Sequence, residues 1–247
     1  MLSGDGGRPA PRDAARGAAL RLHPDARAVV LGGSVLTSAR TAYSDLDLVV
    51  LLDGAPAPYR LSLAEAGWPV EVFAHTVESW RGFVDRETAR RRSPLLFLCA
   101  RGELVHDRDG CGAALVAEAR QRVAAGPRPI GAYELEPYRY ALTDLLDDLR
   151  GCVDPAERTF VAAEIARRTA ELAVLVRGGW VGTGKWAARR LREVAPETLR
   201  EMEAAVRACL GDEDPHPLLD VAGAVLDEAG GPLWEGFRRA GDVAPAP

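Results

Sequence analysis

The sequence predicts an α+β domain with a mixed sheet, followed by an all-α helical bundle. Segments typical of strands alternate with helical segments only in the first half of the chain. The run Gly126-Pro127-Arg128-Pro129 holds two prolines and a glycine, which interrupt any regular element and mark a linker. Because 247 residues are enough for two small domains, we expect one domain at 1–126 and a second at 127–247.

The first half should fold in the order helix, strand, helix, strand, strand, helix, helix, strand, helix. The first of its strands is a short apolar run, the second nearly alternates at its start, and the third alternates apolar and polar residues. We expect the helices to cover one side of the sheet. The elements are expected at 12–22, 28–31, a helix after Gly33, 46–52, 69–74, two helices within 77–99 that separate near Ser93-Pro94, 102–106 and 111–125.

The second half carries helical signals throughout and no convincing strand. Leu142, Leu145 and Leu149 lie at helical spacing. Pro155 directly after Asp154 is typical of a helix start, because proline suits the first turn and aspartate caps it. Helices are expected at 137–150, 155–177, 185–194, 196–210 and 217–229.

The composition excludes several classes of protein. The net charge of −5 argues against a nucleic-acid binder, because affinity for phosphate backbones needs basic residues. The longest apolar run, Leu95–Ala100, is far shorter than the ~20 residues that span a bilayer, and no signal peptide is visible, so we expect a cytoplasmic protein. The four cysteines lack metal or redox spacing and should be reduced thiols. Pairing as a homodimer is left open.

Two aspartates open the second expected strand, in the segment Asp45-Leu46-Asp47-Leu48. Residues two apart on a strand point to one face, so the two carboxylates repel each other unless a cation lies between them. Glu71 lies between valines in the next strand and joins the same face if the two strands are neighbours. Mg²⁺ prefers carboxylate oxygens together with nucleotide phosphates. The sequence therefore predicts a magnesium site at Asp45, Asp47 and Glu71.

Gly32, Gly33 and Ser34 follow the first strand. Glycines allow a phosphate to approach the backbone closely, a following helix would direct free N–H groups at it, and Ser34 adds a hydroxyl donor. Each feature alone has a plain structural explanation, such as a tight turn, a loop cap or a surface glutamate. Their joint order favours in-line attack on a nucleoside triphosphate, with pyrophosphate as the leaving group.

The combination of Gly32-Gly33-Ser34, Asp45-Leu46-Asp47-Leu48 and Val70-Glu71-Val72 resembles the signature of the nucleotidyltransferase superfamily that contains DNA polymerase beta. The resemblance covers roughly residues 12–125. The helical second half looks like that of the antibiotic nucleotidyltransferases, such as the kanamycin and streptomycin enzymes. The resemblance implies that Ser34 contacts the triphosphate and that Asp45, Asp47 and Glu71 hold two Mg²⁺ ions.

We therefore expect a Mg²⁺-dependent enzyme that moves a nucleoside monophosphate to a hydroxyl of a small molecule, such as an aminoglycoside-like antibiotic. The expected nucleotide is ATP, from which AMP is transferred. Whether Glu71 holds metal or activates the acceptor stays open. Two alternatives also stay open: an antitoxin-type enzyme that nucleotidylates a partner protein, and a non-catalytic nucleotide-binding relative.

Lys185 is the only lysine in the chain. It follows Gly182-Thr183-Gly184, which lacks the spacing of a P-loop. It would either reach a bound triphosphate as a compact charge that arginine replaces poorly, or lie exposed at a helix start.

Acidic residues of the second half have two interpretations. Those at helical spacing with arginines favour a solvated, salt-bridged face, whereas a general base or a contact to a cationic acceptor is the sharper hypothesis. They are Asp144, Asp148, Glu157, Glu164 and Glu171.

Overall fold

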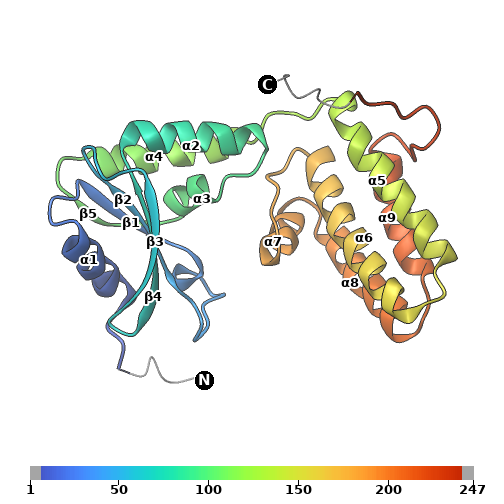
Figure 1. Ribbon diagram of the computed structural model, residues 1–247, viewed down its shortest axis with the longest axis horizontal. Coiled ribbons are helices and arrows are strands. Elements are labelled where there is room, and N and C mark those ends of the chain that lie inside the picture. Colours follow the sequence, from blue (N-terminus) through green and yellow to red (C-terminus); the bar gives the residue numbers. More distant parts are fainter. Residues whose placement is uncertain (1–6, 241–247) are drawn as a thin grey trace, which may run out of the picture. The chain divides into compact units, whose positions relative to one another are not determined.

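The computed structural model describes residues 7–240. The first six residues, part of the segment in which no signal peptide is expected, lie outside this range. The chain divides into two compact units, which meet in sequence at Pro127 and Arg128 (Figure 1). The first is an α+β unit and the second is helical, which confirms the predicted fold class. No helix among the described residues is long and apolar enough to cross a membrane.

The first unit contains a five-stranded mixed sheet in the order β3-β4-β2-β1-β5. β2 and β4 are parallel, and the other neighbours are antiparallel. The strands are β1 (Ala28–Gly32), β2 (Leu46–Leu51), β3 (Tyr59–Glu65), β4 (Trp68–His75) and β5 (Glu103–Asp107).

Helices cover both faces of this sheet, so the expectation of helices on one side is wrong. Alanines of α1 pack with Leu31, Leu48 and Val72 in one core cluster, whereas α2, α3 and α4 contact the strands from the other face. β1 is buried at every residue, and a strand buried on both faces shows no alternation that would reveal a second layer. The helices are α1 (Pro11–Leu22), α2 (Val77–Ala89), α3 (Pro94–Ala100) and α4 (Cys111–Ala125).

Strand β3 is absent from the sequence prediction. It is a mostly exposed edge strand joined to β4 by a two-residue turn, in which Ala66 and Gly67 both have positive φ. Such turns are usually signalled by Asn-Gly or Asp-Gly. The turn here is Ala-Gly, and few side chains of the strand are buried. The sequence therefore lacks both signals from which a hairpin is usually predicted.

The second unit contains five helices and, among its described residues, no strand. Helix α5 begins at Ala132 rather than at residue 137, because Glu134 accepts the N–H of Gly131 and fixes an earlier start. Pro137 is accommodated inside the helix. The helices are α5 (Ala132–Gly151), α6 (Pro155–Val176), α7 (Lys185–Val194), α8 (Pro196–Gly211) and α9 (His216–Glu228), and they share one hydrophobic core.

Close packing of α3 against β1 generates a stability prediction. A Cβ atom at Gly102 would lie 2.3 Å from the carbonyl oxygen of Leu98 and 2.8 Å from that of Leu31. Because these are backbone atoms, we expect Gly102→Ala to lower the free energy of unfolding by about 1–3 kcal/mol in urea denaturation. Gly54→Ala is the matched control, since its Cβ would meet nothing within 4 Å. Equal stabilities of the two variants would contradict this packing.

Candidate functional site

Three of the predicted site residues form a row across adjacent strands. Asp47 of β2 is the register partner of Glu71 in the parallel strand β4 and of Gly32 in the antiparallel strand β1. Register partners point to the same face, and neighbouring strands lie about 4.8 Å apart. The structure therefore brings the Asp47 and Glu71 side chains together on the face opposite α1.

Asp45 directly precedes β2 and, like Asp47, is half-buried. The intervening residue Leu46 is fully buried in the core cluster with α1. This alternation leaves both aspartates outside that core at the start of the strand.

Gly33 lies directly against Asp47. Its φ of 87° and ψ of −172° belong to a conformation that is essentially restricted to glycine. A Cβ atom there would lie 2.2 Å from Oδ2 of Asp47. Both the backbone conformation and the carboxylate thus require glycine, and the missing side chain leaves room for the Asp47 carboxylate beside the turn.

Ser34 is buried, and its hydroxyl forms a 3.0 Å hydrogen bond with the hydroxyl of Ser44. Ser44 Oγ also accepts the N–H of Thr41 at 3.0 Å. Ser44 therefore ties the Gly33-Ser34 turn to the segment that enters Asp45. Sequence reasoning missed Ser44, although a hydroxyl directly before the first aspartate was the signal available.

The helix expected after Gly33 is a single 3₁₀ turn, Ser34–Leu36. The hydroxyl of Thr37 donates to the Ser34 carbonyl and accepts the N–H of Ala39, and such local bonds compete with helix propagation. A helix dipole directed at a phosphate is therefore not part of this turn, and any phosphate contact has to come from the loop itself.

Two residues of strand β3 bond to Glu71. The sequence does not predict them, because it does not predict the strand. Nη2 of Arg60 lies 2.6 Å from Oε1 of Glu71, and Ser62 donates to the same oxygen at 3.3 Å. The Arg60 guanidinium also lies over the ring of Phe73. Among the described residues, Oε2 of Glu71 accepts no hydrogen bond, so one oxygen is held and the other is available.

The donor set of this row fits Mg²⁺. Asp45, Asp47 and Glu71 offer carboxylate oxygens, the ligands that Mg²⁺ prefers in proteins. Oδ2 of Asp47 takes the place of the Cβ that Gly33 lacks, so this carboxylate lies directly against the turn.

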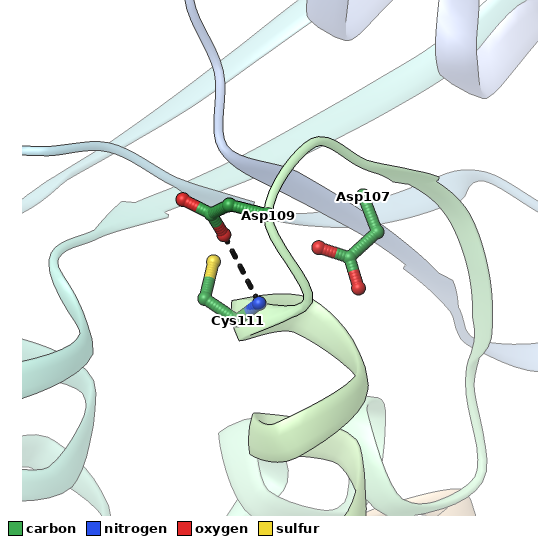
Figure 2. A group of neighbouring side chains, drawn as sticks. All are labelled: Asp107, Asp109 and Cys111. Carbon is green, nitrogen blue, oxygen red and sulfur yellow. Dashed lines mark hydrogen bonds between the residues drawn. The ribbon is translucent and has the colours of Figure 1, made fainter.

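A second group of potential ligands lies at the start of α4. Asp107, Asp109 and Cys111 place one ligand atom each within 4.8 Å of one another (Figure 2). Both oxygens of Asp107 are engaged, however: Oδ1 accepts the N–H groups of Gly110 and Gly112, and Oδ2 accepts that of Ala113. This carboxylate therefore caps the N-terminus of α4.

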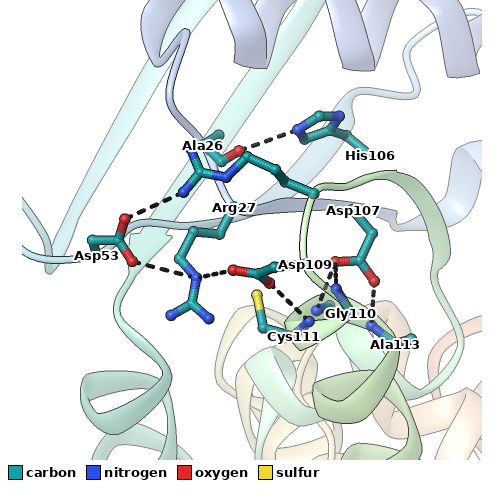
Figure 3. A network of polar contacts seen from close by, with 11 residues as sticks. Ala26, Arg27, Asp53, His106, Asp107, Asp109, Gly110, Cys111 and Ala113 are labelled. Atoms are coloured by element: carbon teal, nitrogen blue, oxygen red, sulfur yellow. Dashed lines mark hydrogen bonds and ion pairs between the residues drawn. The ribbon is translucent and has the colours of Figure 1, made fainter.

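The other two members of this group are held in the same network (Figure 3). Asp109 accepts the N–H of Cys111 at 3.0 Å and the Nε–H of Arg27 at 2.8 Å, and hydrogen bonds from Arg27 and Cys111 hold the pKa of Asp109 well below its usual range. Burial and the neighbouring Asp109 raise the pKa of Cys111 to about 11.

Lys185 lies in the second unit, exposed at the first residue of α7. Its contact with a triphosphate stays a prediction.

Four of the five acidic residues singled out in the second unit fall into two groups, and the fifth, Asp144, is half-buried in α5. Glu164 pairs with Arg168 at 2.8 Å and Arg167 with Glu171 at 3.0 Å, which is the salt-bridged face expected from their spacing. Bonds to the arginines lower the pKa of Glu164 to about 2. Two others, Asp148 and Glu157, line an open hollow at the α5–α6 connection together with Asp147, Gly151, Cys152, Phe160 and Val161.

Comparison with known proteins finds similarity among solved structures. No protein-family model and no curated protein matches the sequence. Among solved structures, the chain is similar to a nucleotidyltransferase-like protein from Exiguobacterium sibiricum 255-15, with 12% sequence identity and a TM-score of 0.45. The match covers 89% of this chain and 77% of that chain. A likeness of this degree assigns no activity here.

The contact between Gly33 and Asp47 generates a metal-binding prediction. We expect Gly33→Ala to weaken Mn²⁺ binding at least ~10-fold, because its Cβ displaces the Asp47 carboxylate. The measurement is a Mn²⁺ titration followed by electron paramagnetic resonance. Gly67→Ala is the matched control: Gly67 also has positive φ, at 79°, but its nearest neighbour is the flexible Arg8 side chain. Unchanged Mn²⁺ affinity in Gly33→Ala would contradict a metal at Asp47.

The Asp107 cap generates a second prediction. Asp107→Ala leaves three backbone N–H groups without their acceptor, so we expect the free energy of unfolding to fall by about 1–2 kcal/mol. Asp53→Ala removes only exposed ion pairs with Arg27 and Arg108 and should cost less than about 1 kcal/mol. If Asp107 holds no metal, EDTA should change the stability of the wild type and of Asp107→Ala by the same amount. An EDTA effect that disappears in Asp107→Ala would instead identify a metal bound at Asp107.

Proposed function

We propose that the protein is a Mg²⁺-dependent nucleotidyltransferase, which transfers the nucleoside monophosphate of ATP or another nucleoside triphosphate to a hydroxyl of a small-molecule acceptor and releases pyrophosphate. The observation that carries the proposal is the row of Gly32, Asp47 and Glu71 across β1, β2 and β4, with Gly33 packed against Asp47. A glycine turn and paired carboxylates on one sheet face suit a phosphate and its metal ion.

Asp45, Asp47 and Glu71 are the residues that would hold Mg²⁺. When bound there, Mg²⁺ neutralises the charge of the triphosphate and of the leaving pyrophosphate. The chain's own contribution is positioning. Asp47 and Glu71 lie on hydrogen-bonded strands, and sites built on strands are held more rigidly than sites on loops.

Gly33 and Ser34 would receive the phosphates. The Asp47 carboxylate takes the place of a Cβ atom at Gly33, so phosphates received by this turn would lie beside a proposed metal ligand. The 3.0 Å bond between Ser34 and Ser44 fixes the turn relative to Asp45, so that phosphate and metal contacts keep a constant separation.

Two roles are compatible with Glu71. Arg60 and Ser62 hold Oε1, which leaves Oε2 for a metal ion or for the proton of the acceptor hydroxyl. In the reaction, the hydroxyl oxygen forms a bond to the α-phosphorus, the bond between the α-phosphorus and the bridging oxygen breaks, and the hydroxyl proton passes to a carboxylate or to solvent.

The acceptor is proposed from charge. Residues 127–247 carry 15 basic and 21 acidic side chains, and an acidic surface concentrates cationic molecules near it. Asp148 and Glu157 line the hollow at the α5–α6 connection and would contact such an acceptor, for example an aminoglycoside-like polycation. Lys185 would contact the triphosphate.

The test is pyrophosphate release by the purified full chain with Mg²⁺ and each of ATP, GTP, CTP and UTP, alone and with a panel of aminoglycosides and lincosamides. We expect acceptor-dependent release that falls at least ~100-fold in Asp47→Asn, because a charged ligand is lost. Asp53→Asn, an exposed aspartate outside the row, should keep full activity. Calorimetry accompanies the assay: absence of Mg²⁺-dependent nucleotide binding in the wild type would contradict the proposal, whichever acceptor is supplied.

A further inference from the structure

Tyr43 is the most exposed large hydrophobic residue among those that the structure describes, with 94% of its surface accessible. It lies two residues before Asp45 in the loop that enters β2. A single exposed aromatic ring is ordinary on a protein surface. What distinguishes Tyr43 is the rigidity of its loop and its place beside the proposed site.

Hydrogen bonds that do not involve the ring brace the loop. Ser44 donates its N–H to the Thr41 carbonyl at 3.1 Å, and Thr41 donates its N–H to Ser44 Oγ at 3.0 Å. The N–H of Tyr43 donates to Thr41 Oγ1 at 3.2 Å. The bond between Ser44 and Ser34 anchors this loop to the core of the unit. The fold thus holds the backbone of Tyr43 in place while its ring faces solvent.

Chain geometry places the backbone of Tyr43 close to the proposed site. Consecutive Cα atoms are 3.80 Å apart, so the Cα atoms of Tyr43 and Asp45 lie within about 7.6 Å of each other. Ser44, between them, is bonded to Ser34 in the turn proposed to receive phosphates. Tyr43 therefore lies in the loop that joins the phosphate turn to the carboxylates, one residue from the Ser44 anchor and two from Asp45.

We infer that Tyr43 stacks on the nucleobase of the bound nucleoside triphosphate. The inference rests on the proposed function and adds the group that recognises the base. A planar, solvated ring offers a face to any of the four bases, since stacking on an aromatic side chain tolerates every base. Tyr43 therefore contributes affinity for the nucleoside without selecting among bases.

The test separates the nucleoside from the triphosphate. Calorimetric titrations in Mg²⁺ compare ATP, GTP, CTP and UTP with inorganic tripolyphosphate, which has no base. We expect Tyr43→Ala to raise the Kd of each nucleotide about 5- to 100-fold and to leave the Kd of tripolyphosphate unchanged. The loop bond of Tyr43 comes from its backbone N–H, so the substitution retains it.

Two matched variants complete the experiment. Tyr43→Phe keeps a stacking face and should bind nucleotides like the wild type. Tyr133→Ala removes another exposed ring, 61% accessible and in the second unit, and should change neither Kd.

Two outcomes in Tyr43→Ala would overturn the inference: unchanged nucleotide affinity, or an equal loss of affinity for nucleotides and tripolyphosphate. If the wild type binds neither nucleotide nor tripolyphosphate with Mg²⁺, the proposed function itself fails, and this result is distinct because it does not depend on Tyr43.

Discussion

The parallel pairing of β2 with β4 is the constraint on which the candidate site depends. It sets Asp47 beside Glu71 in register, and two carboxylates at that separation repel each other unless positive charge lies nearby. On the Glu71 side, Arg60 of β3 supplies such a charge at 2.6 Å. The topology makes this possible, because β3 pairs with the outer edge of β4 and leaves the inner edge for β2. The edge strand β3 therefore supplies a positive charge to the carboxylate row in addition to completing the sheet.

Glycine at position 33 is the second requirement. The strand β1 ends at Gly32 beside Asp47, and the chain then turns in a conformation that side chains do not tolerate. The turn continues into a buried hydroxyl pair that fixes the next loop. Strand end, turn and loop thus form one hydrogen-bonded unit around the aspartates. This arrangement explains how a site can be rigid although only part of it lies on regular strands.

The first unit holds two groups of carboxylates, and their hydrogen bonds distinguish them. Asp107 and Asp109 accept backbone N–H groups at the start of α4, and Arg27 binds Asp109. Those bonds use the carboxylate oxygens for capping. In the strand row, Glu71 keeps one oxygen that accepts no bond among residues 7–240. Proximity of acidic groups alone therefore does not identify a metal site. A candidate metal site also needs carboxylate oxygens that no other hydrogen bond occupies.

The sequence by itself determined the fold class, most of the elements and the choice of Asp45, Asp47 and Glu71 as residues to examine, because alternation, apolar runs and capping residues are local signals. It did not determine strand β3, the helices on both sheet faces or the short turn after Gly33. Those features depend on pairing between distant segments and on competition from side-chain hydrogen bonds. Only the tertiary structure decided which strands are neighbours, and hence that Glu71 lies beside Asp47 and is held by Arg60. Register is a property of two strands, and neither strand's own sequence specifies its partner.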